Sequence, residues 1–219
     1  DQQPQICWVK MSKALVNGIN IFYKVQGNGE PLILVMGLGG ECGDWVLQIR
    51  AFAKHYRVIT FDNRGVGKSD KPGKPYTTNT MADDIVGLMD HLGIDKAHVL
   101  GVSLGGMITQ EVAIHHPARV RKLVLASTSA GRAEKGRHSP EFLRAMGLKE
   151  DFSDEDIKSA DIGKVTTSLN AHAFGNGALK LVAVPFLWLR VKLFGVEGLQ
   201  GQFAAAMTHS TLDRLHLIK

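Results

Sequence analysis

The stretch that decides the fold is Ala97-His98-Val99-Leu100-Gly101-Val102-Ser103-Leu104-Gly105-Gly106, which reads as a short apolar strand, then Gly-x-Ser-x-Gly, then a helix start. This order is typical of a nucleophile elbow, a strained strand-to-helix turn that projects a serine hydroxyl away from its own backbone. Gly101 and Gly105 suit such a turn, because strand and helix approach so closely that a Cβ at either position would clash. The helix after Ser103 adds free N–H groups and a positive dipole end, which favour a developing oxyanion.

The residues that follow the motif strengthen this interpretation. A helix is predicted over 104–116, ending at His115-His116-Pro117, and a second apolar strand is predicted over 120–126. Together with the first strand they form a βαβ unit around Ser103, which is the context that the motif requires. A glycine-flanked turn with an idle serine remains the alternative.

Strands and helices alternate through the first 131 residues, which predicts an α/β fold with a mostly parallel sheet flanked by helices. Asn17-Gly18 predicts a tight hairpin turn within 14–26, and the continuous apolar run 31–36 predicts a buried strand. Further predicted elements are a helix near 44–55 capped by Asp44, a strand over 57–61, and a helix capped by Thr80 and closed by Gly93.

The character of the chain changes after Gly131, because residues 132–218 read as helices and loops without a clear strand. We therefore expect an N-terminal α/β core over 1–131 and a helical cap over 132–219 that lies over the strand ends. The apolar stretch 179–196 is most simply a pair of cap helices covering a pocket.

Composition favours one globular domain and no nucleic-acid partner. The 219 residues are 44% apolar, with a formal net charge of +5 that is scattered and interleaved with acidic residues, so no nucleic-acid surface is expected. The longest apolar run, 181–189, is too short to span a bilayer.

Two cysteines, Cys7 and Cys42, offer neither a disulfide framework nor metal-ligand spacing, so we expect a cytoplasmic setting and no metal. For the nine histidines we expect surface or packing roles.

The glycine-rich loop 36–40 is interpreted as an oxyanion loop. Acyl transfer needs two donors near the substrate carbonyl, usually the N–H after the nucleophile and one from the loop after the third strand. Here these are the N–H groups of Leu104 and Leu38, while Gly37 and Trp45 are expected to line the substrate pocket. A plain glycine turn is the alternative.

Two glycine-containing loops also resemble phosphate-binding motifs, but each departs from its motif. Residues 37–43 approach a dinucleotide fingerprint, but Cys42 stands where the last glycine belongs and Glu41 would face a pyrophosphate. Residues 65–69 resemble the end of a P-loop, but Asp62 stands at the leading glycine position. We expect Asp62 and Arg64 instead to tie loops together beneath the site.

Three segments together carry a resemblance to a known superfamily: Met36-Gly37-Leu38-Gly39-Gly40, Asp62-Asn63-Arg64-Gly65-Val66-Gly67-Lys68-Ser69-Asp70 and Gly101-Val102-Ser103-Leu104-Gly105-Gly106-Met107. The chain resembles the α/β-hydrolases, above all their small capped carboxylesterases, 3-oxoadipate enol-lactonase-like enzymes and related perhydrolases. The resemblance is good over 14–129 and loose over the cap. Met36 departs from it, since many members carry His there.

The resemblance implies a serine hydrolase that needs no cofactor and cleaves carboxylic esters or lactones through an acyl-enzyme formed on Ser103. Its order, Ser then acid then His, implies a catalytic Asp and His on about 60 further residues, two βα units beyond Lys219. We expect these as a separate C-terminal chain, an omitted segment or a truncated part. A non-catalytic ligand-binding pseudoenzyme remains the alternative, as does a perhydrolase or C–C hydrolase of the same superfamily.

Overall fold

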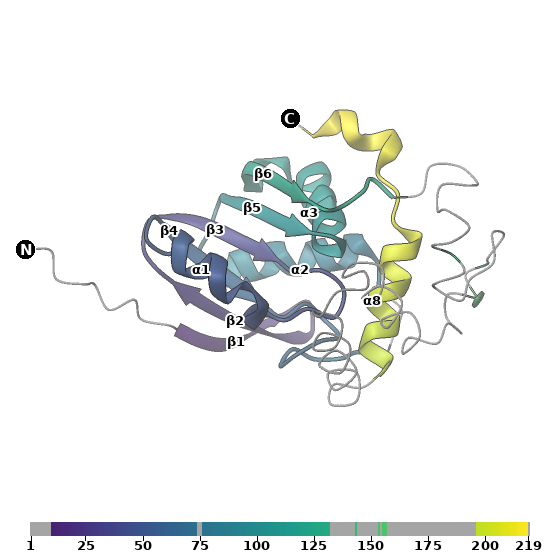
Figure 1. Cartoon of the computed structure of the whole chain (residues 1–219), viewed down its shortest axis with the longest axis horizontal. Helices are drawn as coiled ribbons and strands as arrows, with labels where there is room; N and C mark the ends of the chain where they lie inside the picture. The colour runs from purple at the N-terminus through teal and green to yellow at the C-terminus, as the bar shows by residue number, and fades with distance from the viewer. Residues whose placement is uncertain are drawn as a thin grey trace, which may run out of the picture.

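The computed structural model describes residues 10–73, 76–131, 143, 153, 155–156 and 196–218. Its centre is a six-stranded sheet with the order β1-β2-β4-β3-β5-β6, parallel from β4 to β6 and antiparallel at the β1–β2 edge (Figure 1). The strands are β1 (Lys10–Val16), β2 (Ile19–Gln26), β3 (Glu30–Val35), β4 (Tyr56–Phe61), β5 (Ala97–Val102) and β6 (Val120–Ala126). The helices are η1 (Cys42–Trp45), α1 (Val46–Phe52), α2 (Thr78–His91), α3 (Leu104–His115), η2 (Pro117–Arg119), α8 (Val196–Thr208) and η3 (Leu212–Leu217). The predicted α/β fold, a mostly parallel sheet flanked by helices, is confirmed over the described residues.

The hairpin at the start of the sheet forms where the sequence predicts it. Asn17 and Gly18 connect β1 to β2 with φ values of 48° and 78°. Two consecutive positive φ angles are those of a type I′ turn, whose twist matches the twist of paired strands.

Alternate residues of β3 face opposite sides of the sheet, and each side is covered by helices. Leu32 and Leu34 pack with residues of α1, whereas Ile33 and Val35 belong to the larger core beneath α2 and α3. Figure 1 shows α1 on one face of the sheet, with α2 and α3 on the other. Burial on both faces explains why the predicted strand 31–36 is continuously apolar.

Two predicted helix caps are wrong by a few residues. Asp44 lies inside η1, whose N-cap is Glu41, and its Oδ2 accepts a hydrogen bond from the Glu41 amide at 2.9 Å. Thr80 lies in the first turn of α2, and its amide donates to the Oγ1 of the true cap, Thr77, at 3.0 Å. Both segments offer several capping side chains within one turn, so sequence spacing alone does not choose between them.

The strand β6 forms an edge of the described sheet. Its residues Val124 and Leu125 are 49% and 42% exposed, although both are apolar. Of the region predicted as a cap, the structure describes mainly α8 and η3, and the predicted helix pair over 179–196 lies almost entirely outside the described residues. The division of the chain at residue 131 stays a prediction.

Candidate functional site

Ser103 occupies the strained turn between β5 and α3. Its φ of 54° and ψ of −121° lie outside the regions that side chains with a Cβ usually adopt. Its amide donates to the Ala126 carbonyl at 3.0 Å, and its carbonyl accepts from the Gly106 amide at 2.9 Å and from Thr128 Oγ1 at 2.7 Å. The backbone is therefore held from β6 and α3, while the serine side chain is exposed.

The glycines around Ser103 are required by close backbone approach. A Cβ on Gly101 would meet the Gly105 carbonyl, and a Cβ on Gly105 would meet the Val35 carbonyl. Both contacts are far below van der Waals distance, so no larger residue fits at either position. The predicted clash is confirmed at both positions, although at Gly105 the close backbone belongs to β3 and not to the strand of the turn.

The loop after β3 lies directly beside the serine. A Cβ on Gly37 would lie 3.1 Å from Ser103 Cβ and 3.7 Å from Ser103 Oγ. The loop is fixed by two side chains, since Asn63 Nδ2 donates to the Met36 carbonyl at 3.0 Å and the Gly39 amide donates to Gln202 Oε1 at 2.9 Å. The amides of Leu38 and Leu104 make no hydrogen bond to any residue that the structure describes, so both can donate a hydrogen bond to a ligand oxygen.

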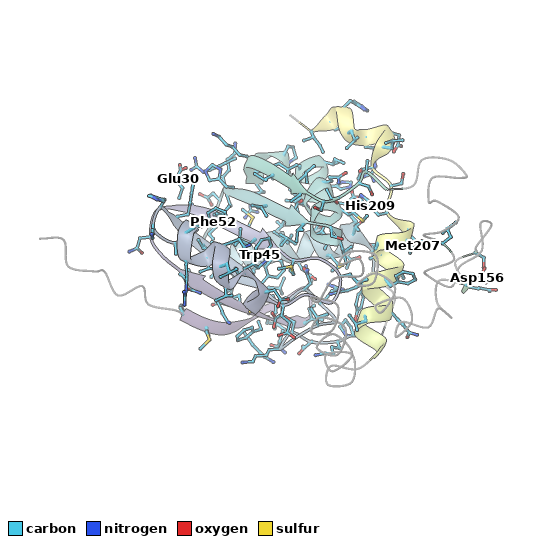
Figure 2. All side chains as sticks on the ribbon, in the orientation of Figure 1. Glu30, Trp45, Phe52, Asp156, Met207 and His209 are labelled. Carbon is cyan, nitrogen blue, oxygen red and sulfur yellow. The ribbon has the colours of Figure 1, made fainter. Side chains whose placement is uncertain are left out.

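Trp45 lies in a different environment from the one expected for a pocket residue. It is 5% exposed and packs with Leu32, Leu34, Ile49 and Val58 between α1 and the sheet (Figure 2). Met36 and Val102, which adjoin Gly37 and Ser103 in the chain, pack against the same cluster. Trp45 thus supports the floor of the site, and its contact with a substrate stays a prediction.

Asp62 and Arg64 tie loops together, as predicted. Asp62 accepts hydrogen bonds from the Cys42 amide at 2.7 Å and the Lys68 amide at 2.8 Å. Arg64 donates two hydrogen bonds of 2.6 Å to Asp84 on α2. These contacts join the loops after β3 and β4 to each other and to α2.

The same contacts argue against both phosphate-binding interpretations. In the first loop, the amides of Gly39, Gly40 and Cys42 donate to other groups of the protein. In the second, the Lys68 amide donates to Asp62, and the Ser69 hydroxyl donates to the Asp62 carbonyl at 2.6 Å. A phosphate cradle needs such donors to be free.

A buried polar cluster lies on α3, and the sequence pattern does not reveal it. Glu111 accepts two hydrogen bonds from Arg214, at 2.9 and 3.0 Å, and lies 3.5 Å from His209 Nδ1. His209 is buried at the end of α8 and contacts Thr78 Oγ1 at 3.0 Å (Figure 2). Burial raises the pKa of Glu111, but the hydrogen bonds from His209 and Arg214 outweigh burial and lower this pKa to about 2. The cluster therefore holds an ionised carboxylate and fastens the segment after α8 to α3.

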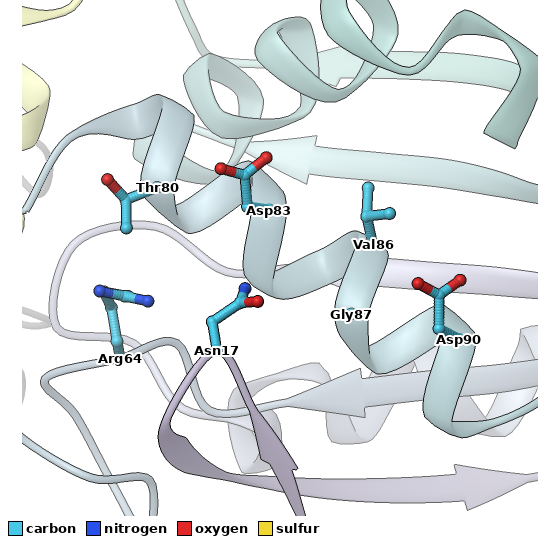
Figure 3. Close-up of a pocket in the computed structure, with 7 residues that line it drawn as sticks. All are labelled: Asn17, Arg64, Thr80, Asp83, Val86, Gly87 and Asp90. Atoms are coloured by element: carbon cyan, nitrogen blue, oxygen red, sulfur yellow. The ribbon is translucent and has the colours of Figure 1, made fainter.

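A groove of about 410 Å³ lies elsewhere, between α2, the β1–β2 turn and Arg64 (Figure 3). Its polar side chains already have partners: Asp83 lies 3.3 Å from His116 Nε2, and Asp90 accepts a hydrogen bond of 2.7 Å from Arg119. Ser103 is not among the residues that line it. The groove is therefore a weaker candidate than the serine turn.

The described residues hold no cluster of three or more His, Cys, Asp or Glu side chains that could bind a metal ion. Within the same part of the chain, no helix is both long enough and apolar enough to cross a membrane.

Several known proteins with similar sequences or structures are named as hydrolases. An enol-lactonase from Acinetobacter baylyi, 3-oxoadipate enol-lactonase 2, is 36% identical over 125 residues, covering 56% of this chain and 47% of that protein. A protein from Azorhizobium caulinodans, provisionally named a carbamate hydrolase, is 37% identical over 108 residues, covering 49% of this chain and 41% of that protein. The solved enol-lactonase of Burkholderia xenovorans LB400 superposes with a TM-score of 0.74 at 25% identity, covering 95% of this chain and 78% of that one.

The matched segments span less than half the length of these two curated relatives. The family model described as "alpha/beta hydrolase fold" matches residues 30–171, which include the loop after β3, the Asp62 loop and the serine turn. From its fold, its elbow and this match, the chain belongs to the α/β-hydrolase family.

Proposed function

We propose that Ser103 is the nucleophile of a serine hydrolase that cleaves carboxylic esters or lactones through an acyl-enzyme. The observation that carries the proposal is the geometry of one residue: an exposed serine, held at a φ of 54° between a strand and a helix, with Gly37 against its side chain. Enol-lactonases among the relatives and solved structures support the substrate class.

The oxyanion formed by attack on the carbonyl would bind to the N–H groups of Leu104 and Leu38. Leu104 opens α3, so its N–H lies at the positive end of the helix dipole. Leu38 lies between Gly37 and Gly39 in a loop whose backbone is fixed by Asn63 and Gln202. Two fixed donors stabilise a charge without reorganising during the reaction, which is usually the largest contribution to acyl-transfer catalysis.

Proton transfer needs a base that the described residues do not provide. No described histidine is within hydrogen-bond distance of Ser103 Oγ, and the buried His209 is engaged with Glu111 and Thr78. A serine hydroxyl is a weak nucleophile without an adjacent base. The proposed mechanism therefore includes a histidine oriented by a carboxylate, contributed from outside the described residues, and the cap predicted over 132–219 would cover the bound substrate.

Covalent capture tests the proposal. The protein is treated with a fluorophosphonate probe and analysed by peptide mass spectrometry, alongside Ser103→Ala and Ser127→Ala. Ser127 is a matched control, because it is exposed and has a φ of 46° but does not precede a helix. We expect one adduct, on Ser103, which Ser127→Ala retains. Failure to modify Ser103 would favour the alternative of a ligand-binding pseudoenzyme.

A panel of p-nitrophenyl esters, lactones and carbamates then defines the leaving group. Ser103→Ala should abolish hydrolysis of every active substrate, and hydrolysis that survives this substitution would refute the assignment of Ser103. A C–C hydrolase remains the second candidate, because a meta-cleavage product hydrolase superposes with a TM-score of 0.64 at 30% identity. Turnover of a vinylogous diketone without ester hydrolysis would favour that candidate.

A further inference from the structure

Gln202 on α8 bridges the two loops that flank the serine turn. Its side chain is fully buried, with 0% exposure. Its Oε1 accepts a hydrogen bond from the Gly39 amide at 2.9 Å, and its Nε2 donates to the Arg64 carbonyl at 2.8 Å. One carboxamide thus pairs a donor from the loop after β3 with an acceptor from the loop after β4.

The helix that carries Gln202 is docked by backbone contact. A Cβ on Gly198 would overlap the Gly65 carbonyl, and a Cβ on Gly65 would lie 2.7 Å from the Gly198 carbonyl. One turn later, a Cβ on Gly201 would lie 2.5 Å from the ring of Tyr76. These contacts leave α8 little freedom to shift, so the position of the Gln202 carboxamide is fixed by the fold.

The bond to Gly39 controls the backbone next to the proposed oxyanion donor. Because the peptide group is planar, holding the Gly39 N–H fixes the plane of the Leu38–Gly39 peptide. The Leu38 N–H belongs to the Gly37–Leu38 peptide, whose carbonyl accepts a hydrogen bond from the Gly40 amide at 3.1 Å. Gly39 lies inside this turn with a φ of 70° and no side chain to restrict it, so its bond to Gln202 adds a second restraint to the loop. One residue before that turn, Asn63 holds the Met36–Gly37 peptide through the Met36 carbonyl.

We propose that Gln202 is a positioning residue: it holds the loop of Gly37–Gly40 so that the Leu38 N–H faces the oxyanion. The inference rests on the proposed function, since it assigns Leu38 as a donor. In this role Gln202 touches no reacting atom and acts through the Gly39 peptide. A purely structural role would instead limit Gln202 to docking α8.

Substitution by methionine tests this role, because methionine is similar in length and forms neither hydrogen bond. Gln200→Met is the matched control: Gln200 lies on the same helix, is only partly buried, and has no hydrogen bond to a described residue. Loss of a whole oxyanion donor lowers kcat by about 100- to 1000-fold, so a misaligned donor should lower it by about 10- to 100-fold. KM should change by less than about 2-fold, because the contact to Leu38 strengthens only in the transition state. Gln200→Met should retain the wild-type kcat.

Glutamate at position 202 provides a rescue test. A protonated carboxyl offers one acceptor and one O–H donor, as the carboxamide does, whereas a carboxylate cannot donate to the Arg64 carbonyl. Burial raises the pKa of such a carboxyl. We expect the kcat of Gln202→Glu, relative to wild type at each pH, to recover as pH falls, whereas the relative kcat of Gln202→Met should show no recovery.

Amide hydrogen exchange of Gly39, measured by NMR, separates this inference from the function on which it rests. Exchange at Gly39 should accelerate at least about 10-fold in Gln202→Met and stay unchanged in Gln200→Met. An unchanged Gly39 exchange rate, or a lower melting temperature with unchanged kcat, would overturn the positioning role. If hydrolysis does not depend on Ser103, the function fails and the catalytic role of Gln202 fails with it, while the exchange result still shows whether Gln202 holds the loop.

Discussion

Gly37→Ala probes the contact between the loop after β3 and the serine turn. The added methyl group would lie 3.1 Å from Ser103 Cβ and 3.2 Å from the Val102 carbonyl. Carbon atoms prefer a separation of about 3.5–4.0 Å, so the loop or the serine must move by a few tenths of an ångström. Overpacking of this kind typically costs about 1–3 kcal/mol.

The expected effect is larger on catalysis than on folding. Displacement of a reacting group by about 1 Å can cost about 100-fold in rate, so a shift of a few tenths of an ångström should lower kcat by about 3- to 10-fold. Because Gly37 needs no positive φ, the free energy of unfolding should fall by no more than the overpacking cost. Ester hydrolysis and urea unfolding are measured in parallel.

The neighbouring Gly43→Ala is the control for this substitution. A Cβ on Gly43 meets nothing within 4 Å, so this variant should match wild type in kcat and in stability. A wild-type kcat in Gly37→Ala would refute this reasoning. The close approach of Gly37 to Ser103 would then not affect catalysis, and the loop after β3 would not belong to the proposed site.

Two further predictions concern groups away from the serine. The pKa of Glu111 is lowered from 4.5 to about 2, so its contribution to stability is complete above pH 4.5 and is lost as pH falls toward 2. That pKa difference limits the contribution of Glu111 to the free energy of unfolding to about 3 kcal/mol, and solvent screening reduces this to about 2 kcal/mol. Urea unfolding should show this loss in the wild-type protein between pH 7 and pH 3, and a smaller loss in Glu111→Gln. Equal losses in the two proteins would contradict the prediction. Burial, reinforced by Asp62, raises the pKa of Cys42 to about 12. Iodoacetamide at pH 8 should therefore leave Cys42 unmodified until urea is added, as measured by peptide mass spectrometry. Fast alkylation of Cys42 in the native protein would contradict this prediction.

Local rules were enough to predict the elements that build the serine turn. Asn17-Gly18, the apolar run of β3 and the Gly-x-Ser-x-Gly motif each act through neighbouring residues, and each forms the predicted structure. The cap of α2 was misplaced because Thr77, Thr78 and Thr80 all have hydroxyl groups within one turn. Here the difference in energy between neighbouring caps depends on backbone geometry that the sequence pattern does not contain.

Contacts between distant residues could not be predicted in the same way. Gln202 and Gly39 are separated by 163 residues, and Arg214 and Glu111 by 103. Nothing in the spacing of α8 distinguishes Gln202 from Gln200, because only the docked helix shows which of them is buried. Trp45 likewise follows a glycine-rich loop that suggests a pocket, but the direction of η1 turns its ring toward the sheet.

The bond between Gly39 and Gln202 also has a consequence for the order of events during synthesis. Ribosomes add about 5–20 residues per second, so roughly ten to thirty seconds separate the appearance of the two partners. In the later part of that interval the nascent chain contains the residues of the serine turn, but the Gly39 amide still lacks its partner on α8. The loop after β3 therefore gains this restraint only after α8, one of the last elements to be synthesised, has docked.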